Sequence, residues 1–224
     1  MASKRKLRIL ALHSFRTSGT IFQEQMRRAG LDTALEDLVE IIYATSPRPA
    51  SGPPPEDVHP YFQGPYYEWW NAETVEGQHG RSVTFHGWDT ALSFITDFIS
   101  LHGPFDGVMG FSQGTILTSL LVGLQQQGAI MKGLPHFRFC LLFAGLPAGD
   151  PALKYVYDEP LRTPSLHVMG EKDFVLKYSK LLAKLFKDPI VIMHPRGHVI
   201  PALKGDSLET MRSFLQTHQQ AANL

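Results

Sequence analysis

The sequence predicts an α/β protein: a mostly parallel sheet with helices packed on both faces. Short apolar blocks typical of buried strands alternate with amphipathic helical patterns, an order that favours parallel strands joined by helices. The chain has 224 residues, of which 43% are hydrophobic and 19% charged, which excludes a disordered or fibrous protein. A chain of this size buries about 70% of its unfolded surface, so we expect a single domain over residues 1–224.

The first part of the chain gives a strand, a helix and a second strand. Residues 7–12 form an apolar run that stops at His13, and residues 39–44 form the next one. Between them, residues 20–29 have a helical pattern. Gly30 ends this helix, because glycine is favoured just past the last helical turn.

Regular structure resumes at Trp88. Apolar residues at positions 88, 92, 95 and 99 recur on one face of a helix, which Gly103-Pro104 ends. Further strands are predicted from short apolar runs at residues 107–111, 139–144, 166–169 and 190–193. The remaining helices are predicted at residues 113–127, 176–186 and 207–216.

Residues 45–87 interrupt this alternation, and we interpret them as a lid-like insertion. Seven of the 16 prolines lie between Pro47 and Pro65, a density that excludes regular helix or central strand. Six aromatic residues follow, namely Tyr61, Phe62, Tyr66, Tyr67, Trp69 and Trp70. The segment either covers a substrate or is a surface loop with its rings tucked into the core. We favour the lid, with Tyr66, Trp69 and Trp70 lining the substrate pocket.

Charge and cysteine content exclude several classes of protein. Basic and acidic residues each number 21, so the formal net charge is 0, and a broad nucleic-acid or anionic-membrane footprint is not expected. Cys140 is the only cysteine, which excludes an internal disulfide and a cysteine zinc site; its apolar surroundings predict a buried residue. The sequence contains no phosphate-binding loop, dinucleotide fingerprint or metal-ligand motif, so we expect no cofactor or metal.

The N-terminus favours a soluble, cytoplasmic protein. Residues 9–12 are too short an apolar run for a signal peptide, and no run approaches the roughly 18 residues of a membrane span. Lys4-Arg5-Lys6 leaves a nuclear signal open, although a solvated terminus is the simpler interpretation.

The clearest chemical signal follows the strand at residues 107–111. Gly110-Phe111-Ser112-Gln113-Gly114 is a G-x-S-x-G pattern that joins a strand to a helix, the context of a nucleophile elbow. In such an elbow the glycines let the strand and helix backbones approach, and the strained serine projects its hydroxyl from the sheet edge. The alternative is an ordinary glycine-rich turn with a solvent-exposed serine.

A serine hydroxyl needs a base to take its proton, and the base needs an acid to orient it. Ligands of parallel sheets bind at the carboxyl ends of strands, and in an elbow fold the chain order is serine, acid, histidine. His198 follows the last strand and is the favoured base. His167 and His194 lie within strands, where a packed role is expected. His136 precedes any plausible acid, and His218 lies in the terminal helix.

Asp173 is the favoured acid, because it follows the strand at residues 166–169. Glu171 in the same loop is a possible substitute. Asp150 also follows a strand and is the runner-up. Asp188 precedes a strand and would lie at the wrong end of the sheet.

Two backbone N–H groups are expected to stabilise an oxyanion. Gln113 stands at a helix N-terminus directly after the serine, and Phe15 lies in the loop after the first strand. His13 precedes the serine in the chain, so we expect it to shape this loop rather than to act as the base.

Four stretches carry a resemblance to a known family. They are His13-Ser14-Phe15-Arg16; Trp69-Trp70; Gly103-Pro104-Phe105-Asp106-Gly107 leading into the elbow; and Pro164 through Asp173 with Gly197-His198-Val199-Ile200-Pro201. Over about Leu7 to Phe214, the chain resembles the FSH domain family of serine hydrolases. The resemblance implies an α/β-hydrolase fold, a triad of Ser112, Asp173 and His198, and carboxylesterase activity.

The resulting hypothesis is a serine carboxylesterase acting on small-molecule acyl esters of medium or long chain. An acyl thioesterase would use the same triad, since some relatives are similar to such enzymes. A catalytically silent binding protein would keep the fold without an activated serine. We expect neither a nucleic-acid partner nor stable membrane insertion.

Overall fold

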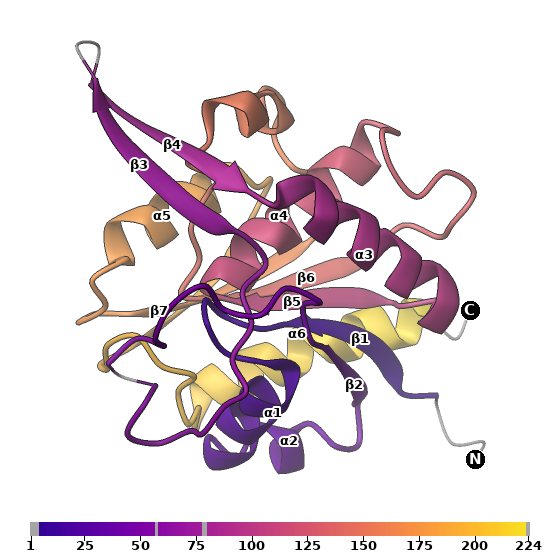
Figure 1. The fold of residues 1–224 in the computed structure, drawn as a ribbon. Helices are drawn as coiled ribbons and strands as arrows, with labels where there is room; N and C mark the ends of the chain where they lie inside the picture. The colour runs from indigo at the N-terminus through magenta and orange to yellow at the C-terminus, as the bar shows by residue number, and fades with distance from the viewer. Residues whose placement is uncertain (1–4, 57, 78–79, 223–224) are drawn as a thin grey trace.

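The computed structural model describes residues 5–56, 58–77 and 80–222 (Figure 1). Within these residues, a central sheet has the strand order β2-β1-β5-β6-β7-β8, and all neighbouring pairs are parallel. The strands are β1 Leu7–Leu12, β2 Val39–Ala44, β5 Gly107–Phe111, β6 Phe139–Phe143, β7 Ser165–Gly170 and β8 Ile190–His194. The predicted parallel sheet is confirmed, with each strand end within one residue of its predicted position.

Helices cover both faces of this sheet. They are α1 Gly19–Arg28, α2 Leu31–Ala34, α3 Trp88–His102, α4 Gln113–Gln126, α5 Leu176–Lys184 and α6 Asp206–Ala222, with a 3₁₀ helix η1 at Pro151–Tyr157. In Figure 1, α1, α2 and α6 lie below the sheet, and α3, α4 and α5 lie above it. Each face has its own hydrophobic cluster. No helix in the described ranges is both long and apolar enough to cross a bilayer.

The last helix is longer than predicted. It was expected to end at residue 216 but continues to Ala222. The His218 ring packs on Phe139 and Phe214, with ring centroids 4.8 and 4.7 Å apart. These contacts with the sheet anchor the final turns, so His218 is a packed residue rather than part of a frayed end.

The insertion contains a hairpin that the sequence did not indicate. Strands β3 (Asn71–Gly77) and β4 (Gly80–His86) pair antiparallel and project beyond the main sheet (Figure 1). Their polar composition lacks the apolar runs from which strands were predicted. The Asp150 carboxylate fixes the base of the hairpin, because it accepts hydrogen bonds from the Phe85 and Ala152 N–H groups at 2.8 and 2.9 Å.

The proline-rich part of the insertion is closed at its base. Tyr67 bridges Thr17 and Pro49 in antiparallel fashion, and the Ala50 N–H donates to the Tyr66 carbonyl at 2.9 Å. The two ends of the segment 51–65 are therefore held close together. Their far end reaches α1, where Arg28 donates to the Tyr61 carbonyl at 3.2 Å.

Asp106 explains the Gly-Pro-Phe-Asp-Gly motif in structural terms. Its buried carboxylate accepts two 2.7 Å hydrogen bonds from Arg5 and one of 2.9 Å from the Arg8 N–H. Burial would raise the pKa of this carboxyl, but the hydrogen bonds from Arg5 and Arg8 hold it below its usual value. The motif thus fixes the starts of β1 and β5 relative to one another.

The sheet order also locates a crevice. β2 pairs with one edge of β1 and β5 with the other, so the connections after β1 and β5 lead away in opposite directions. In open α/β sheets, ligands bind at the carboxyl ends of the strands beside such a switch point. The loops carrying His13 and Ser112 meet there.

Candidate active site

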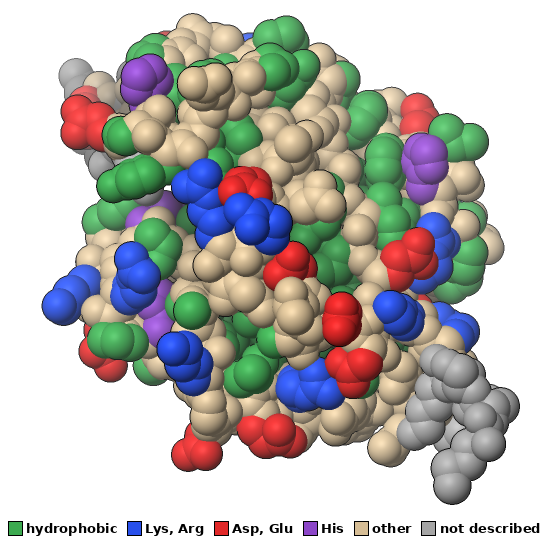
Figure 2. Space-filling model, turned by 90° about the horizontal axis from the view of Figure 1, so that it is seen from below, with side chains coloured by type: hydrophobic (Ala, Val, Ile, Leu, Met, Phe, Trp, Pro, Cys, Tyr) green, Lys and Arg blue, Asp and Glu red, His purple; other side chains and the backbone are tan. Residues whose placement is uncertain are grey.

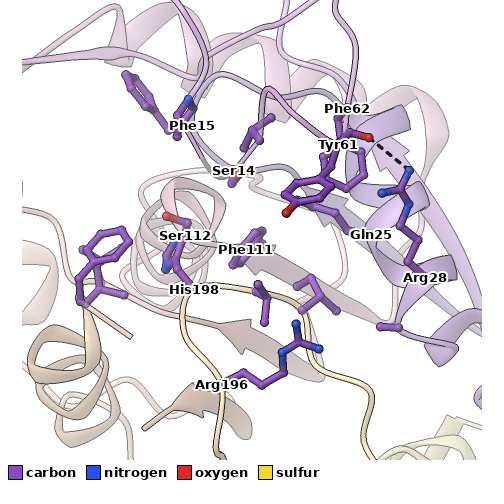
Figure 3. Close-up of a pocket in the computed structure, with 18 of the residues that line it drawn as sticks. Ser14, Phe15, Gln25, Arg28, Tyr61, Phe62, Phe111, Ser112, Arg196 and His198 are labelled. Carbon is purple, nitrogen blue, oxygen red and sulfur yellow. Dashed lines mark hydrogen bonds between the residues drawn. The ribbon is translucent and has the colours of Figure 1, made fainter. Parts of the chain in front are cut away.

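Ser112 stands at the strained turn between β5 and α4. Its backbone has φ 51° and ψ −114°, a conformation that L-residues avoid unless the surrounding structure enforces it. The Ser112 N–H donates to the Phe143 carbonyl at 3.0 Å, and its carbonyl accepts from the Thr115 N–H at 2.8 Å. These bonds hold the strained residue, and its hydroxyl is half-buried at the wall of a cavity (Figure 3).

The two glycines of the motif are required by close backbone contacts. A Cβ on Gly110 would lie 2.3 Å from the backbone of Gly114, and one on Gly114 would lie 2.0 Å from the Leu12 carbonyl oxygen. Neither backbone can move away without separating strand from helix. The predicted reason for Gly110 and Gly114 is therefore confirmed.

His198 and Asp173 form a hydrogen-bonded pair. Nδ1 of His198 lies 3.0 Å from both carboxylate oxygens of Asp173, and Asp173 also accepts the Val175 N–H at 2.9 Å. Burial would raise the pKa of Asp173, but the hydrogen bonds from His198 and Val175 lower it below its usual value. Because an ionised carboxylate only accepts hydrogen bonds, Nδ1 carries the proton, and Nε2 of the neutral ring keeps its lone pair.

The imidazole of His198 lies between two aromatic rings. The Phe111 and Phe174 ring centroids are 5.0 and 4.6 Å away, and Ser112 and His198 line the same cavity (Figure 3). No hydrogen bond joins the Ser112 hydroxyl to the imidazole within the described part of the chain. Such bonds are often long without substrate and tighten when it binds.

Asp150, His167 and His194 have structural roles. Asp150 holds the β3–β4 hairpin, as described above, and Glu171 is exposed. His167 is buried in β7 beside the Ser165 hydroxyl at 3.1 Å, and burial lowers its pKa to about 4. His194 is buried at the end of β8 and accepts the Arg196 N–H. The packed role expected for these two strand histidines is confirmed.

His13 shapes the loop after β1. Its Nδ1 lies 2.8 Å from the Ser14 carbonyl oxygen, which can only accept, so Nδ1 is the donor. Its Nε2 accepts the Ser46 N–H at 3.1 Å. Burial lowers the pKa of His13 to about 4, and with both ring nitrogens occupied it has no lone pair free to act as a base.

Gln113 and Phe15, whose N–H groups are the expected oxyanion donors, lie at the start of α4 and in the wall of the cavity. Gln113 is the first residue of α4, so its N–H has no acceptor within the helix. Ser14 and Phe15 line the cavity on the opposite side of Ser112 from His198 (Figure 3). Arg16, which has φ 51°, stacks its guanidinium 4.6 Å from the Phe15 ring centre.

The side chain of Gln113 has a role that the sequence did not reveal. Its Oε1 accepts the Trp69 N–H at 3.0 Å, and its Nε2 donates to the Trp70 carbonyl at 2.8 Å. The Trp69 indole N–H in turn donates to the His13 carbonyl at 2.9 Å. The tryptophan pair therefore ties the insertion to the loop after β1 and to the elbow.

Replacing Gln113 with alanine should lower the free energy of unfolding by about 2–4 kcal/mol, because it leaves two buried backbone groups without partners. Urea denaturation measures the loss. Gln126→Ala is the matched control: it removes similar bonds to the Arg162 N–H and the Pro160 carbonyl, but at an exposed site, where less than about 1 kcal/mol is expected. Equal losses in the two variants would contradict this role for Gln113.

Glu68 is a second unforeseen link. Its buried carboxylate pairs with Arg16 at 3.1 Å and with Arg48 at 3.4 Å. Burial would raise its pKa, but hydrogen bonds from Ser51 and Arg16 lower it overall. The charge therefore joins the insertion to the loop that carries Phe15.

The cavity beside Ser112 has a volume of about 590 Å³. Its walls come from the elbow, the loops after β1, β6, β7 and β8, helix α1 and four residues of the insertion. They include Phe15, Ala29, Pro55, Val58, Phe62, Phe111, Leu146, Phe174, Val175, Val199 and Ile200. This predominantly apolar lining suits a hydrophobic ligand.

The insertion thus lines part of the cavity, but not with the residues expected. Trp69 and Trp70 are fully buried in the core, where Trp69 stacks on His13 and Trp70 on Phe85, each with centroids 4.8 Å apart. The Tyr66 hydroxyl donates to the Phe62 carbonyl at 2.7 Å. None of these three aromatic residues lines the cavity; Pro55, Val58, Tyr61 and Phe62 do.

Within residues 5–56, 58–77 and 80–222, no three His, Cys, Asp or Glu side chains are grouped as metal ligands. Cys140 is buried in β6, as expected, and burial raises its pKa, so its thiol stays protonated.

Comparison with known proteins agrees with this geometry. The chain matches the family Serine hydrolase (FSH1) over residues 1–209. It is 36% identical to Esterase OVCA2 of Homo sapiens over 214 residues, covering 90% of this chain and 92% of that protein. Esterase OVCA2 of Xenopus tropicalis is 33% identical over 214 residues, covering 90% and 89%.

Two solved structures share the fold at low sequence identity. Zea mays acyl-protein thioesterase 2 superposes with a TM-score of 0.64 at 17% identity, covering 97% of this chain and 96% of that one. Esterase PE8 superposes with a TM-score of 0.61 at 20% identity, covering 95% and 92%. The predicted α/β-hydrolase fold is confirmed, and the chain belongs to the FSH1 family of serine hydrolases.

Proposed function

We propose that this hydrolase cleaves medium- and long-chain acyl esters through an acyl-enzyme on Ser112. One observation carries the proposal: a strained serine and an imidazole oriented by Asp173 line one apolar cavity. A buried structural serine would need neither the strained backbone nor a neighbouring histidine whose second nitrogen is left free.

The first half of the reaction forms the acyl-enzyme. Ser112 Oγ attacks the ester carbonyl carbon while Nε2 of His198 takes the hydroxyl proton, and the ionised Asp173 stabilises the imidazolium. The carbonyl oxygen becomes an oxyanion that accepts hydrogen bonds from the N–H groups of Gln113 and Phe15. The carbon–oxygen bond to the alcohol then breaks, and the alcohol leaves with the proton from Nε2.

The second half releases the acid. A water molecule gives a proton to Nε2 as its oxygen attacks the acyl carbon, and the same N–H groups stabilise the second oxyanion. The bond from Ser112 Oγ to the acyl carbon breaks, and Oγ recovers its proton from Nε2. The products are a carboxylic acid and the free enzyme.

The apolar cavity sets the expected acyl preference. Each CH₂ moved from water into such surroundings contributes about 0.8 kcal/mol, or roughly fourfold in binding. The cavity volume falls within the range of about 300–1,000 Å³ that is typical of small-molecule sites. Pro55, Val58 and Phe62 of the insertion supply part of the wall.

A series of p-nitrophenyl esters with increasing acyl length tests this preference. We expect kcat/KM to rise from the acetate to medium-chain esters by up to about fourfold per CH₂, with the rise ending when the cavity is filled. All esters in the series share one leaving group, so differences report on the acyl site. A steady fall in kcat/KM from acetate onward would contradict the proposal.

A further inference from the structure

Helix α5 carries exposed apolar side chains that the fold does not cover. Phe174, just before the helix, is 77% exposed, and Tyr178 and Leu181 are 47% and 48% exposed. Tyr178 and Leu181 are three residues apart, so they lie on the same side of the helix. With Phe174 they form an exposed apolar stripe that begins at the cavity, since Phe174 lines it.

The opposite side of α5 is fixed to the body of the protein. Leu182 and Ala183 are buried, and the Ser179 hydroxyl donates to the Gly145 carbonyl at 2.8 Å. The helix cannot turn its exposed stripe inward without breaking these contacts. Contiguous exposed apolar surface of this kind marks interaction sites in soluble proteins.

Lysines accompany the stripe. Five of the ten lysines in the chain lie between residues 172 and 187, namely Lys172, Lys177, Lys180, Lys184 and Lys187, and all five are exposed. Within this run the acidic residue is Asp173, whose side chain is buried and paired with His198. The exposed Glu171 and Asp188 flank the run, so it remains basic overall. Figure 1 shows α5 at the left of the molecule, above the sheet, and the view from below in Figure 2 shows basic, acidic and hydrophobic side chains intermixed along the left edge. A chain with net charge 0 thus concentrates positive charge beside exposed apolar side chains.

We propose that α5 docks on the surface of an anionic lipid bilayer, with the mouth of the cavity turned toward it. Tyr178, Leu181 and Phe174 would enter the headgroup region while the lysines meet anionic phosphates, a combination that binds membrane surfaces without spanning them. Charge alone would also suit an acidic protein, but the exposed apolar side chains that alternate with these lysines along the chain favour lipid.

This surface lies next to the active site, so docking would bring membrane esters to the reacting groups. This part of the inference rests on the proposed function. Phe174 contacts the His198 ring, with centroids 4.6 Å apart, so the stripe leads directly to the reacting groups. Esters with long acyl chains partition into bilayers, because each CH₂ favours the apolar phase over water by about fourfold. A docked enzyme takes such esters from the membrane without passing them through water.

Vesicle flotation of the full chain tests the docking surface. We expect binding to phosphatidylcholine vesicles containing about 30% phosphatidylserine, and at least about tenfold weaker binding to phosphatidylcholine alone or in high salt. The double variant Lys177→Glu/Tyr178→Ser should lose about tenfold or more in binding. It should keep wild-type turnover of a short, soluble ester, which shows that the fold and active site are intact.

The chain offers a matched control in η1, which packs on α4 and β4. Lys154 and Tyr155 repeat the Lys-Tyr pair, and Tyr155 is 49% exposed, so Lys154→Glu/Tyr155→Ser makes the same chemical change on another element. It should bind vesicles like the wild type. Equal losses in both double variants, or no binding of the wild type to anionic vesicles, would overturn the proposal.

Two further variants separate the possible failures. Binding that is lost in Lys177→Glu but unchanged in Tyr178→Ser would fit an acidic protein surface and would overturn the bilayer assignment. Ser112→Ala should bind vesicles as the wild type does. If vesicles bind but no ester is cleaved by the wild type, the proposed function fails and the docking surface stands.

Discussion

Replacing Ser112 with alanine should lower kcat by at least about 10⁴-fold. The proposed mechanism forms its covalent bond through the Ser112 hydroxyl, and an alanine at the same position leaves the cavity and the His198–Asp173 pair in place. Steady-state turnover of a medium-chain p-nitrophenyl ester measures the loss. Ser93→Ala, on the exposed side of α3, is the control and should keep wild-type kcat. An alanine variant within tenfold of wild type would remove Ser112 from the chemistry.

The strain at Ser112 gives this position a second, independent readout. Glycine adopts a positive φ at little cost, whereas alanine is strained in the same conformation as serine. Ser112→Gly should therefore be as inactive as Ser112→Ala, but more stable by about 1 kcal/mol. Thermal unfolding of the two variants compares them directly. A glycine variant less stable than the alanine variant would contradict strain at the elbow.

Replacing Asp173 with asparagine should lower kcat by about 10³- to 10⁴-fold. A neutral amide cannot stabilise the imidazolium, and its NH₂ group can turn toward Nδ1 and favour the wrong tautomer of His198. Asp150→Asn is the control, since Asp150 also follows a strand but binds the Phe85 and Ala152 N–H groups. It should lose stability while keeping kcat within about fivefold. A larger loss of kcat in Asp150→Asn than in Asp173→Asn would assign the role of the acid to Asp150.

Asp173 also makes stability depend on pH. Its pKa in the folded protein lies below the ordinary value of 3.8, so its contribution is present above about pH 4 and is lost as the pH falls through the folded value. The free energy of unfolding, measured for the wild type and for Asp173→Asn at several pH values, isolates the contribution of Asp173. The free energy of unfolding of the variant should fall less on acidification than that of the wild type, because the variant has no Asp173 carboxylate to protonate.

Local patterns were enough to predict the framework of this fold. The strands are short apolar runs. The elbow is a five-residue motif whose glycines are required by close contacts with the backbone of the adjoining strand and helix. The sequence favours Ser112, Asp173 and His198 because each follows a strand, and a parallel sheet brings such positions to one edge. The structure places all three there, with Asp173 and His198 hydrogen-bonded.

The insertion could not be predicted in the same way, because its conformation depends on distant partners. Trp69 forms hydrogen bonds with His13 and Gln113, which lie 56 and 44 residues away in the sequence. No local sequence pattern predicts such contacts. The many aromatic residues of the insertion predict a pocket lining, but Trp69 and Trp70 are buried in the hydrophobic core. The cavity is lined instead by Pro55, Val58, Tyr61 and Phe62, and Arg28 of α1 donates a hydrogen bond to the Tyr61 carbonyl. The β3–β4 hairpin was missed because its strands are polar.

The reactivity of Ser112 toward a fluorophosphonate probe is the most direct test of the proposed chemistry. The probe bonds to a serine only where a base takes the hydroxyl proton and an oxyanion site receives the phosphoryl oxygen. Mass spectrometry of the treated, folded protein should show one adduct on Ser112, and none on Ser112→Ala. Folded wild-type protein that takes up no probe, or that carries it on another residue, would contradict the account.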